Sequence, residues 1–254
     1  MENECGYKYY ESEDLVFCEG KYADGYLDSN AGEHKRQVIY DSGNRLIFVF
    51  DTIGSPVEEE FIQSWNFMPR AFCEMGIGFK VKKNSWGYED SEIKISDNSI
   101  YTDSENAPNI YLYQFADCEL KYERKRGELN PAVGWFAPAI ASRRVPKTDI
   151  WTKWKSKGEK TILTVIATSE DCNSGIVEMK KNGSGCEFEK NGKKYCVKFT
   201  DDGNIDAFIG DSKIVVNQIG ESYVERAGVK SEIKAPVGFE WEDKDGYSRP
   251  VYIY

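Results

Sequence analysis

The one histidine of the sequence, His34, is the first candidate for chemistry. An imidazole acts as a general acid or base near neutral pH when a carboxylate tunes it, and Asp28 and Glu33 lie close by in sequence. A site with two or more histidine ligands is excluded, and the seven cysteines form no C-x-x-C pair that would indicate a metal or redox site. No phosphate-binding loop, dinucleotide motif or nucleophile elbow is present. We therefore expect no metal and no cofactor.

A second set of candidates combines positive charge with aromatic rings. Residues 121–160 contain eleven Lys or Arg and four Asp or Glu, a local charge of +7, whereas residues 1–30 carry a charge of −6. Guanidinium groups bind carboxylates and sulfates through paired hydrogen bonds, and indole rings suit stacking on sugar rings. The pattern indicates binding of an acidic polysaccharide or oligosaccharide, with candidate residues Trp135, Arg143, Arg144, Trp151 and Lys153.

The same segment also has a plainer explanation. Alternation along a strand places Trp151, Lys153 and Lys155 on one face and Trp154 on the other. Lysines on an exposed strand face discourage pairing between sheet edges and are ordinary there, so the pattern is also typical of a solvated surface. Both interpretations stay open at this point.

The segments that must position these residues alternate apolar and polar side chains with a period of two. They are short, rich in Tyr, Phe, Val and Ile, and separated by turns such as Asn182–Gly183, Asn191–Gly192 and Asp202–Gly203. No window of about eleven residues keeps a helical apolar stripe. We predict an all-β protein, an antiparallel β-sandwich of the supersandwich type with at most one short helical turn.

That helical turn is expected at residues 55–59. Ser55 resembles an N-cap, Pro56 suits the first helical position, and Glu58 follows three residues after the cap. The next residues, 61–67, alternate as a strand does. We therefore expect at most one turn before a strand.

The register of the hairpin around Asn191–Gly192 indicates whether Cys186 and Cys196 could form a disulfide. A two-residue turn at Asn191–Gly192 would pair Phe188 with Tyr195 and Glu187 with Cys196, so that Cys186 faces Val197 and not Cys196. We expect free thiols, which suit a reducing compartment. The first fifteen residues show no signal peptide, so a cytoplasmic location is expected; a periplasmic or secreted location would fit if a leader preceded them.

Composition restricts the function classes. The 254 residues are 40% hydrophobic and 30% charged, which is typical of a globular protein, and a single domain over residues 1–254 is expected, with a sub-boundary near 169–174 as the alternative. The net charge of −10 argues against a nucleic-acid partner. No apolar run reaches the ~20 residues of a membrane span, so no membrane partner is expected.

Several short elements between residues 14 and 170 occur in a recognisable order. An acidic strand ends in Asp24–Gly25–Tyr26, His34–Lys35–Arg36 opens an apolar strand, and a second apolar strand ends at Asp51. Trp65–Asn66–Phe67 and a Gly134–Trp135 element follow. This order resembles the C-terminal β-sandwich of the heparinase II/III family of polysaccharide lyases.

The resemblance implies a structural role for the marker residues. Lyases of this family carry catalytic Tyr and His or Asn residues on an α/α-toroid, and their sandwich adds an H-x-H segment, none of which is found here. No catalytic residue is therefore expected. His34, Arg36, Asp51 and Trp65 are interpreted as structural markers, with Asp51 forming a turn at the end of its strand.

Three functions follow as hypotheses. The first is a non-catalytic sandwich of a heparinase II/III-like lyase, which would take part in β-elimination only beside a toroid supplied by another chain or by the full-length protein. The second is a free-standing carbohydrate-binding protein that uses Trp65, Trp135, Trp151 or Trp154 as a sugar platform. The third is an interaction module that docks with an α/α-toroid partner chain or with a second copy of itself.

Overall fold

The computed structural model describes residues 7–22, 32–67, 93–103, 108–136, 145–168, 178–235, 238–244 and 247–253. In these ranges the regular secondary structure consists of β-strands in antiparallel sheets, without a helix, which confirms the all-β sandwich prediction. Accordingly, the described residues include no helix long and apolar enough to cross a membrane. The Asp24–Gly25–Tyr26 element lies outside the described residues.

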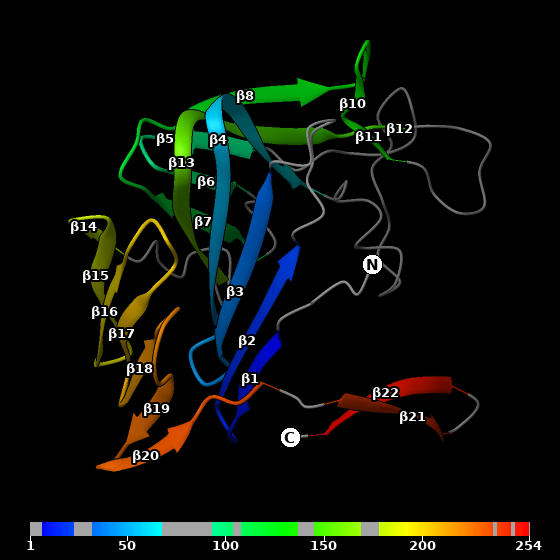
Figure 1. The fold of residues 1–254 in the computed structure, drawn as a ribbon. Helices are drawn as coiled ribbons and strands as arrows, with labels where there is room; N and C mark the ends of the chain where they lie inside the picture. The colour runs from blue at the N-terminus through cyan, green and yellow to red at the C-terminus, as the bar shows by residue number, and fades with distance from the viewer. Residues whose placement is uncertain are drawn as a thin grey trace.

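The first sheet has nine strands, and each pairs antiparallel with its neighbour. Its order is β1 (Tyr7–Glu11), β2 (Leu15–Tyr22), β3 (Glu33–Asp41), β4 (Leu46–Asn66), β13 (Thr148–Thr168), β7 (Ile110–Phe115), β6 (Ser99–Thr102) and β5 (Ile93–Ser96), and β8 (Lys121–Arg126) pairs with β13. The long strands β4 and β13 are central and run side by side in Figure 1.

The second sheet is a meander of consecutive hairpins. It comprises β14 (Lys180–Asn182), β15 (Gly185–Lys190), β16 (Lys193–Phe199), β17 (Ile205–Ile209), β18 (Ser212–Val216), β19 (Tyr223–Arg226) and β20 (Val229–Glu232). Three two-stranded ribbons complete the described elements: β9 (Glu128–Leu129) with β10 (Ala132–Val133), β11 (Trp135–Phe136) with β12 (Val145–Pro146), and β21 (Gly238–Lys244) with β22 (Tyr247–Ile253).

The β15–β16 hairpin has the predicted register. Phe188 pairs with Tyr195, Glu187 with Cys196, and Cys186 with Val197. Asn191 and Gly192 both have positive φ, as a two-residue turn of this kind requires. Cys186 and Cys196 are free thiols, as expected.

The core of the sandwich lies between the two sheets. Phe48 and Phe50 of β4 meet Phe188, Tyr195 and Phe199 of the second sheet, with ring centroids between 5.9 and 6.3 Å apart. The hydrophobic cluster built around these rings contains buried side chains from Leu15 to Ile233. Each fully buried ring or branched side chain contributes roughly 1.5–3 kcal/mol of hydrophobic stabilisation, so this cluster holds the two sheets together.

Strands β4 and β13 extend beyond the sandwich and fold back over its first sheet. Between Ser156 and Gly158 the register shifts, so that residues 56–58 of β4 bulge opposite a single residue of β13. The backbone N–H of Val57 donates to Ser55 Oγ at 3.3 Å within this bulge. No helical turn forms at residues 55–59, within the expected limit of at most one, because Ser55 and Pro56 begin a bulge within a continuous strand.

We call the folded-back part the outer layer: residues 61–66 of β4, residues 148–155 of β13, and β8, which pairs antiparallel with residues 148–153 of β13 near the top of Figure 1. Its inward side chains pack on the first sheet. Ile150 and Trp65 join a cluster with Ile100 and Leu112. Trp154 is 2% exposed and contacts Ile162 and Ala116 in another cluster. The sandwich therefore carries a third layer over part of its first sheet.

Candidate functional site

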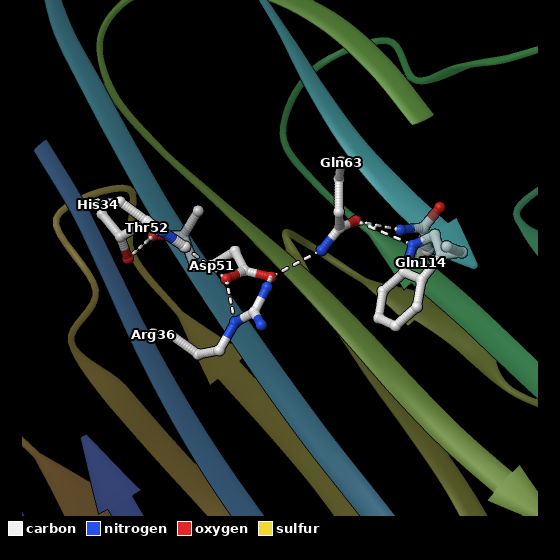
Figure 2. Close-up of polar contacts among 8 residues, drawn as sticks. His34, Arg36, Asp51, Thr52, Gln63 and Gln114 are labelled. Atoms are coloured by element: carbon white, nitrogen blue, oxygen red, sulfur yellow. Dashed lines mark hydrogen bonds and ion pairs between the residues drawn. The ribbon is translucent and has the colours of Figure 1, made fainter. Parts of the chain in front are cut away.

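Asp51 is the centre of a buried polar network between the first sheet and the outer layer (Figure 2). Its carboxylate is 1% exposed. Oδ1 accepts hydrogen bonds from His34 Nε2 at 2.7 Å and Arg36 Nε at 2.6 Å. Oδ2 accepts from Arg36 Nη2 at 3.0 Å and Gln63 Nε2 at 2.7 Å. The expected turn at Asp51 was wrong: the residue lies inside β4, because the strand continues through the bulge.

The network continues from Gln63 into the first sheet. Gln63 Oε1 accepts hydrogen bonds from Trp65 Nε1 at 3.2 Å and from Gln114 Nε2 at 2.6 Å. Gln114 Oε1 in turn accepts from the Thr152 hydroxyl at 2.8 Å. Gln63 and Thr152 belong to the outer layer, whereas Gln114 belongs to β7, so these bonds join the two layers. Buried polar groups that are satisfied in this way fix one arrangement of the layers.

The electrostatics of Asp51 keep it charged. Burial alone raises the pKa of its carboxyl, but hydrogen bonds from His34 and Arg36 outweigh burial and hold the pKa below the ordinary 3.8. An ionised carboxylate only accepts hydrogen bonds, so His34 Nε2 carries the proton in this pair. The carboxylate has four donors around its two oxygens and is sealed from solvent, which leaves it no place for a substrate proton.

A second group of residues gathers on the outward face of the outer layer around Trp151. The ammonium groups of Lys125 and Lys153 lie over its indole, 4.9 Å and 5.2 Å from the ring centroid. Glu123, directly across from Trp151 in the β8–β13 ladder, forms ion pairs with both lysines. We call these four residues the Trp151 cluster.

Trp135 adjoins the Trp151 cluster through Glu128. The indole Nε1 of Trp135 donates to the carbonyl oxygen of Glu128 at 2.7 Å, while the Glu128 carboxylate accepts from Lys125 Nζ at 3.1 Å. Of the candidates from sequence, the structure thus brings Trp135, Trp151 and Lys153 into one neighbourhood. Arg143 and Arg144 lie outside the described residues.

Trp154 and Trp65 do not offer sugar platforms on this face. Trp154 points inward and stacks on Phe61, with ring centroids 5.7 Å apart. It was therefore wrong to consider Trp154 as a platform, although its predicted position opposite Trp151 is correct. Trp65 packs in the cluster beneath the outer layer, and its indole Nε1 is bonded to Gln63.

Sequence reasoning missed the residues that complete both groups. Lys121, Glu123 and Lys125 occupy every second position of β8 and so share one face of the strand. This spacing could have placed Glu123 and Lys125 on the face of Trp151. Gln63 falls between Phe61 and Trp65 in the alternation, so it is a polar residue at an inward position. Such a residue indicates a buried partner, but not which one. The described residues contain no group of three or more His, Cys, Asp or Glu that could hold a metal ion.

Comparison with known proteins shows that this chain has a fold similar to parts of solved structures. No protein-family profile matches the sequence, and no curated protein is significantly similar to it. The crystal structure of heparan sulfate lyase HepC from Pedobacter heparinus aligns with a TM-score of 0.54 at 9% identity, over 74% of this chain and 26% of that one. A heparinase III gene product aligns with a TM-score of 0.50 at 13% identity, over 89% of this chain and 26% of that one.

This chain therefore spans about a quarter of the length of these lyases. Identities this low show the fold alone. At that level the resemblance expected from the sequence is confirmed: the chain has the fold of a β-sandwich region of heparinase-type lyases.

Proposed function

We propose that this chain is a non-catalytic β-sandwich of the heparinase-lyase type that binds an acidic polysaccharide on its outer layer. The observation that carries the proposal is the Trp151 cluster, where two ammonium groups flank one indole. Anionic sugars need both elements: cations for carboxylate or sulfate groups, and an apolar ring face for the sugar ring. The fold likeness to a heparan sulfate lyase supports this class of ligand.

The ion pairs within the cluster do not exclude an anionic ligand. Glu123 is 41% exposed, and ion pairs at such surfaces contribute little to stability. A sulfate or carboxylate can therefore replace Glu123 as the partner of Lys125 and Lys153. Lys121 of β8 shares the outward face with Glu123 and Lys125 and adds one further positive charge. The polymer would lie across β8 and β13 on the outward face.

The absence of enzymatic activity in the isolated chain is part of the proposal. Asp51 is sealed beneath the outer layer, and its two oxygens already accept four hydrogen bonds. Its carboxylate is therefore not placed to take a proton from a uronate ring. We expect no β-elimination product, measured as ultraviolet absorbance of unsaturated uronate, when the purified chain is incubated with heparan sulfate.

A second candidate function is docking with a catalytic α/α-toroid on another chain or in a longer protein. The observation that favours it is the size of the match, since three-quarters of each lyase lies outside the aligned region. In that case glycan affinity would be weak in the isolated chain and would increase when the toroid is supplied. Self-association is the remaining alternative, and light scattering would reveal it.

Calorimetric titration with heparan sulfate tests the binding proposal. We expect Trp151→Ala and Lys153→Ala each to weaken binding by about tenfold, and added salt to weaken it further. Lys213→Ala is the matched control, because Lys213 lies 5.4 Å from the Phe208 ring on the second sheet and forms a similar cation–π pair. Equal losses in all three variants, or no binding by the unaltered chain, would contradict the proposal.

A further inference from the structure

A cavity of about 160 Å³ lies where one end of the second sheet meets the first sheet. Its inner wall is formed by Lys35 of β3 with Thr52 and Gly54 of β4. The turn between β16 and β17 closes one side through Asp202. Lys21, Glu33 and Glu159 form the rim on the first sheet, and none of them belongs to the Trp151 cluster.

Lys35 is the unusual member of this wall, because the residue is only 8% exposed. Its Nζ donates to the carbonyl oxygen of Asp202 at 2.6 Å. In the part of the chain that the structure describes, this is the one acceptor within hydrogen-bonding distance of Nζ, whereas an ammonium has three donors. Burying a charge with unsatisfied donors is costly, so the cavity must supply acceptors, from water or from a ligand.

The surroundings maintain the close approach of Lys35. A Cβ atom built on Gly203 would lie 2.7 Å from Lys35 Nζ and 2.8 Å from Thr52 Oγ1. Burial lowers the pKa of Lys35, and the nearby charges of Glu19, Glu159 and Asp202 oppose that effect. The lysine is thus held at the wall by its packing and by acidic groups around it.

The charges of the lining restrict the chemistry of a ligand. Two basic residues, Lys21 and Lys35, face three acidic ones, Glu33, Glu159 and Asp202. The carboxylates would repel an anionic ligand, and the buried ammonium of Lys35 would repel a cationic one. Hydroxyl groups both donate and accept, so adjacent hydroxyls can bond to Lys35 and to Glu159 at once. The volume equals that of roughly five waters at about 30 Å³ each, which suits a polyol of about one sugar ring.

We propose that this cavity binds a neutral sugar unit, independently of the acidic polymer on the outer layer. The sugar hydroxyls accept from Lys35 and donate to the carboxylates at the rim. The two sites have no residue in common, so failure of either proposal leaves the other intact.

The test compares glucose with glucuronate, which share a ring and differ at one carboxylate, by NMR titration of the backbone amides of Gly54 and Gln218. Gln218 also lines the cavity. We expect glucose to shift both signals with about millimolar affinity, and glucuronate to bind at least about threefold more weakly. Trp151→Ala should leave both titrations unchanged.

Lys35→Met would test the buried ammonium directly, but loss of this buried group could impair folding. The primary variant is therefore Glu159→Gln, at the exposed rim. It removes an acceptor and a negative charge, so glucose should bind about threefold more weakly and the preference over glucuronate should shrink. Glu232→Gln, on the exposed strand β20, is the matched control and should change nothing. Signals that move with neither sugar would show a water-filled cavity, and tighter binding of glucuronate would show an anion site; either result overturns the proposal.

Discussion

Gln63 donates a 2.7 Å hydrogen bond from Nε2 to Asp51 Oδ2, although the two residues are 12 positions apart in one strand. In a straight strand twelve residues span roughly 40 Å. The contact therefore requires β4 to fold back on itself, and it joins the outer layer to the sheet beneath. Without the bend, Asp51 would lack one of its four hydrogen bonds.

Replacing Gln63 with Leu should destabilise the protein. The change removes a donor to Asp51 and leaves Trp65 Nε1 and Gln114 Nε2 without the acceptor they share. We expect the free energy of unfolding to fall by about 2–4 kcal/mol, measured by urea denaturation. Ser64→Ala, the exposed neighbour, should change it by less than about 0.5 kcal/mol. Similar stabilities of the two variants would show that the bond is dispensable.

Asp51 should make the protein sensitive to acid. Its pKa is lowered in the folded state, so the folded protein binds fewer protons near pH 4 than the unfolded chain does. The stability that Asp51 contributes is fully present above its ordinary pKa of 3.8 and is lost as the pH falls through the lower, folded value.

The Asp51→Asn variant isolates this contribution. At pH 7 it should unfold about 3–5 kcal/mol more easily than the unaltered protein, because Arg36 loses its buried carboxylate partner and His34 Nε2 loses an anionic acceptor. Denaturation at pH 7, 5 and 3 should show the difference shrinking toward pH 3. Asp206→Asn, at an exposed position, should follow the unaltered protein throughout. A difference that is constant with pH would contradict the assignment.

Glu123 should limit the affinity of the Trp151 cluster for anions. Its carboxylate forms ion pairs with both lysines, and the hydrogen bond from Lys125 lowers its pKa, so it stays charged. Glu123→Gln should therefore bind heparan sulfate at least about twofold more tightly, with a steeper dependence on salt. Glu225→Gln serves as the control, since Glu225 lies across from Lys213 on the second sheet. Weaker binding by Glu123→Gln would indicate that Glu123 orients the lysines.

Gly203 should not tolerate a side chain. Its φ of +82° disfavours any residue with a Cβ, and a Cβ here would also collide with Lys35. Gly228 has a φ of +78° with no atom within 4 Å of a built Cβ, so Gly228→Ala measures the conformational cost alone. We expect Gly203→Ala to lower the unfolding free energy by at least about 1 kcal/mol more than Gly228→Ala does. Equal costs would mean that Lys35 moves aside freely.

Local patterns predicted much of this fold. Alternation identified the strands, and the Asn191–Gly192 turn fixed the register of its hairpin because two positive φ values allow few alternatives. The same alternation placed Trp151 and Trp154 on opposite faces. These outcomes depend on residues near each other in the chain.

The bend in β4 could not be predicted in this way. Ser55 and Pro56 suit a helix start and a bulge equally well, and the choice depends on pairing with β13, about a hundred residues later. Asp51 looked like a strand end because a carboxylate is rare inside a strand. What keeps it there is the set of donors from β3 and from the folded-back part of β4, which only the tertiary structure brings together.

The pairing of β4 with β13 also bears on the order of folding. Asn66 pairs with Asp149 and Leu46 pairs with Ala167, so about a hundred residues separate the paired segments. Closing such long loops is slow, whereas the second sheet consists of hairpins between consecutive strands. During synthesis, β4 can pair with β3 at once, but it leaves the ribosome long before β13, so its edge toward β13 and its residues beyond Gly54 stay unpaired until then. The acidic residues around its bulge, Glu58, Glu59 and Glu60, give this unpaired segment a negative charge that opposes aggregation.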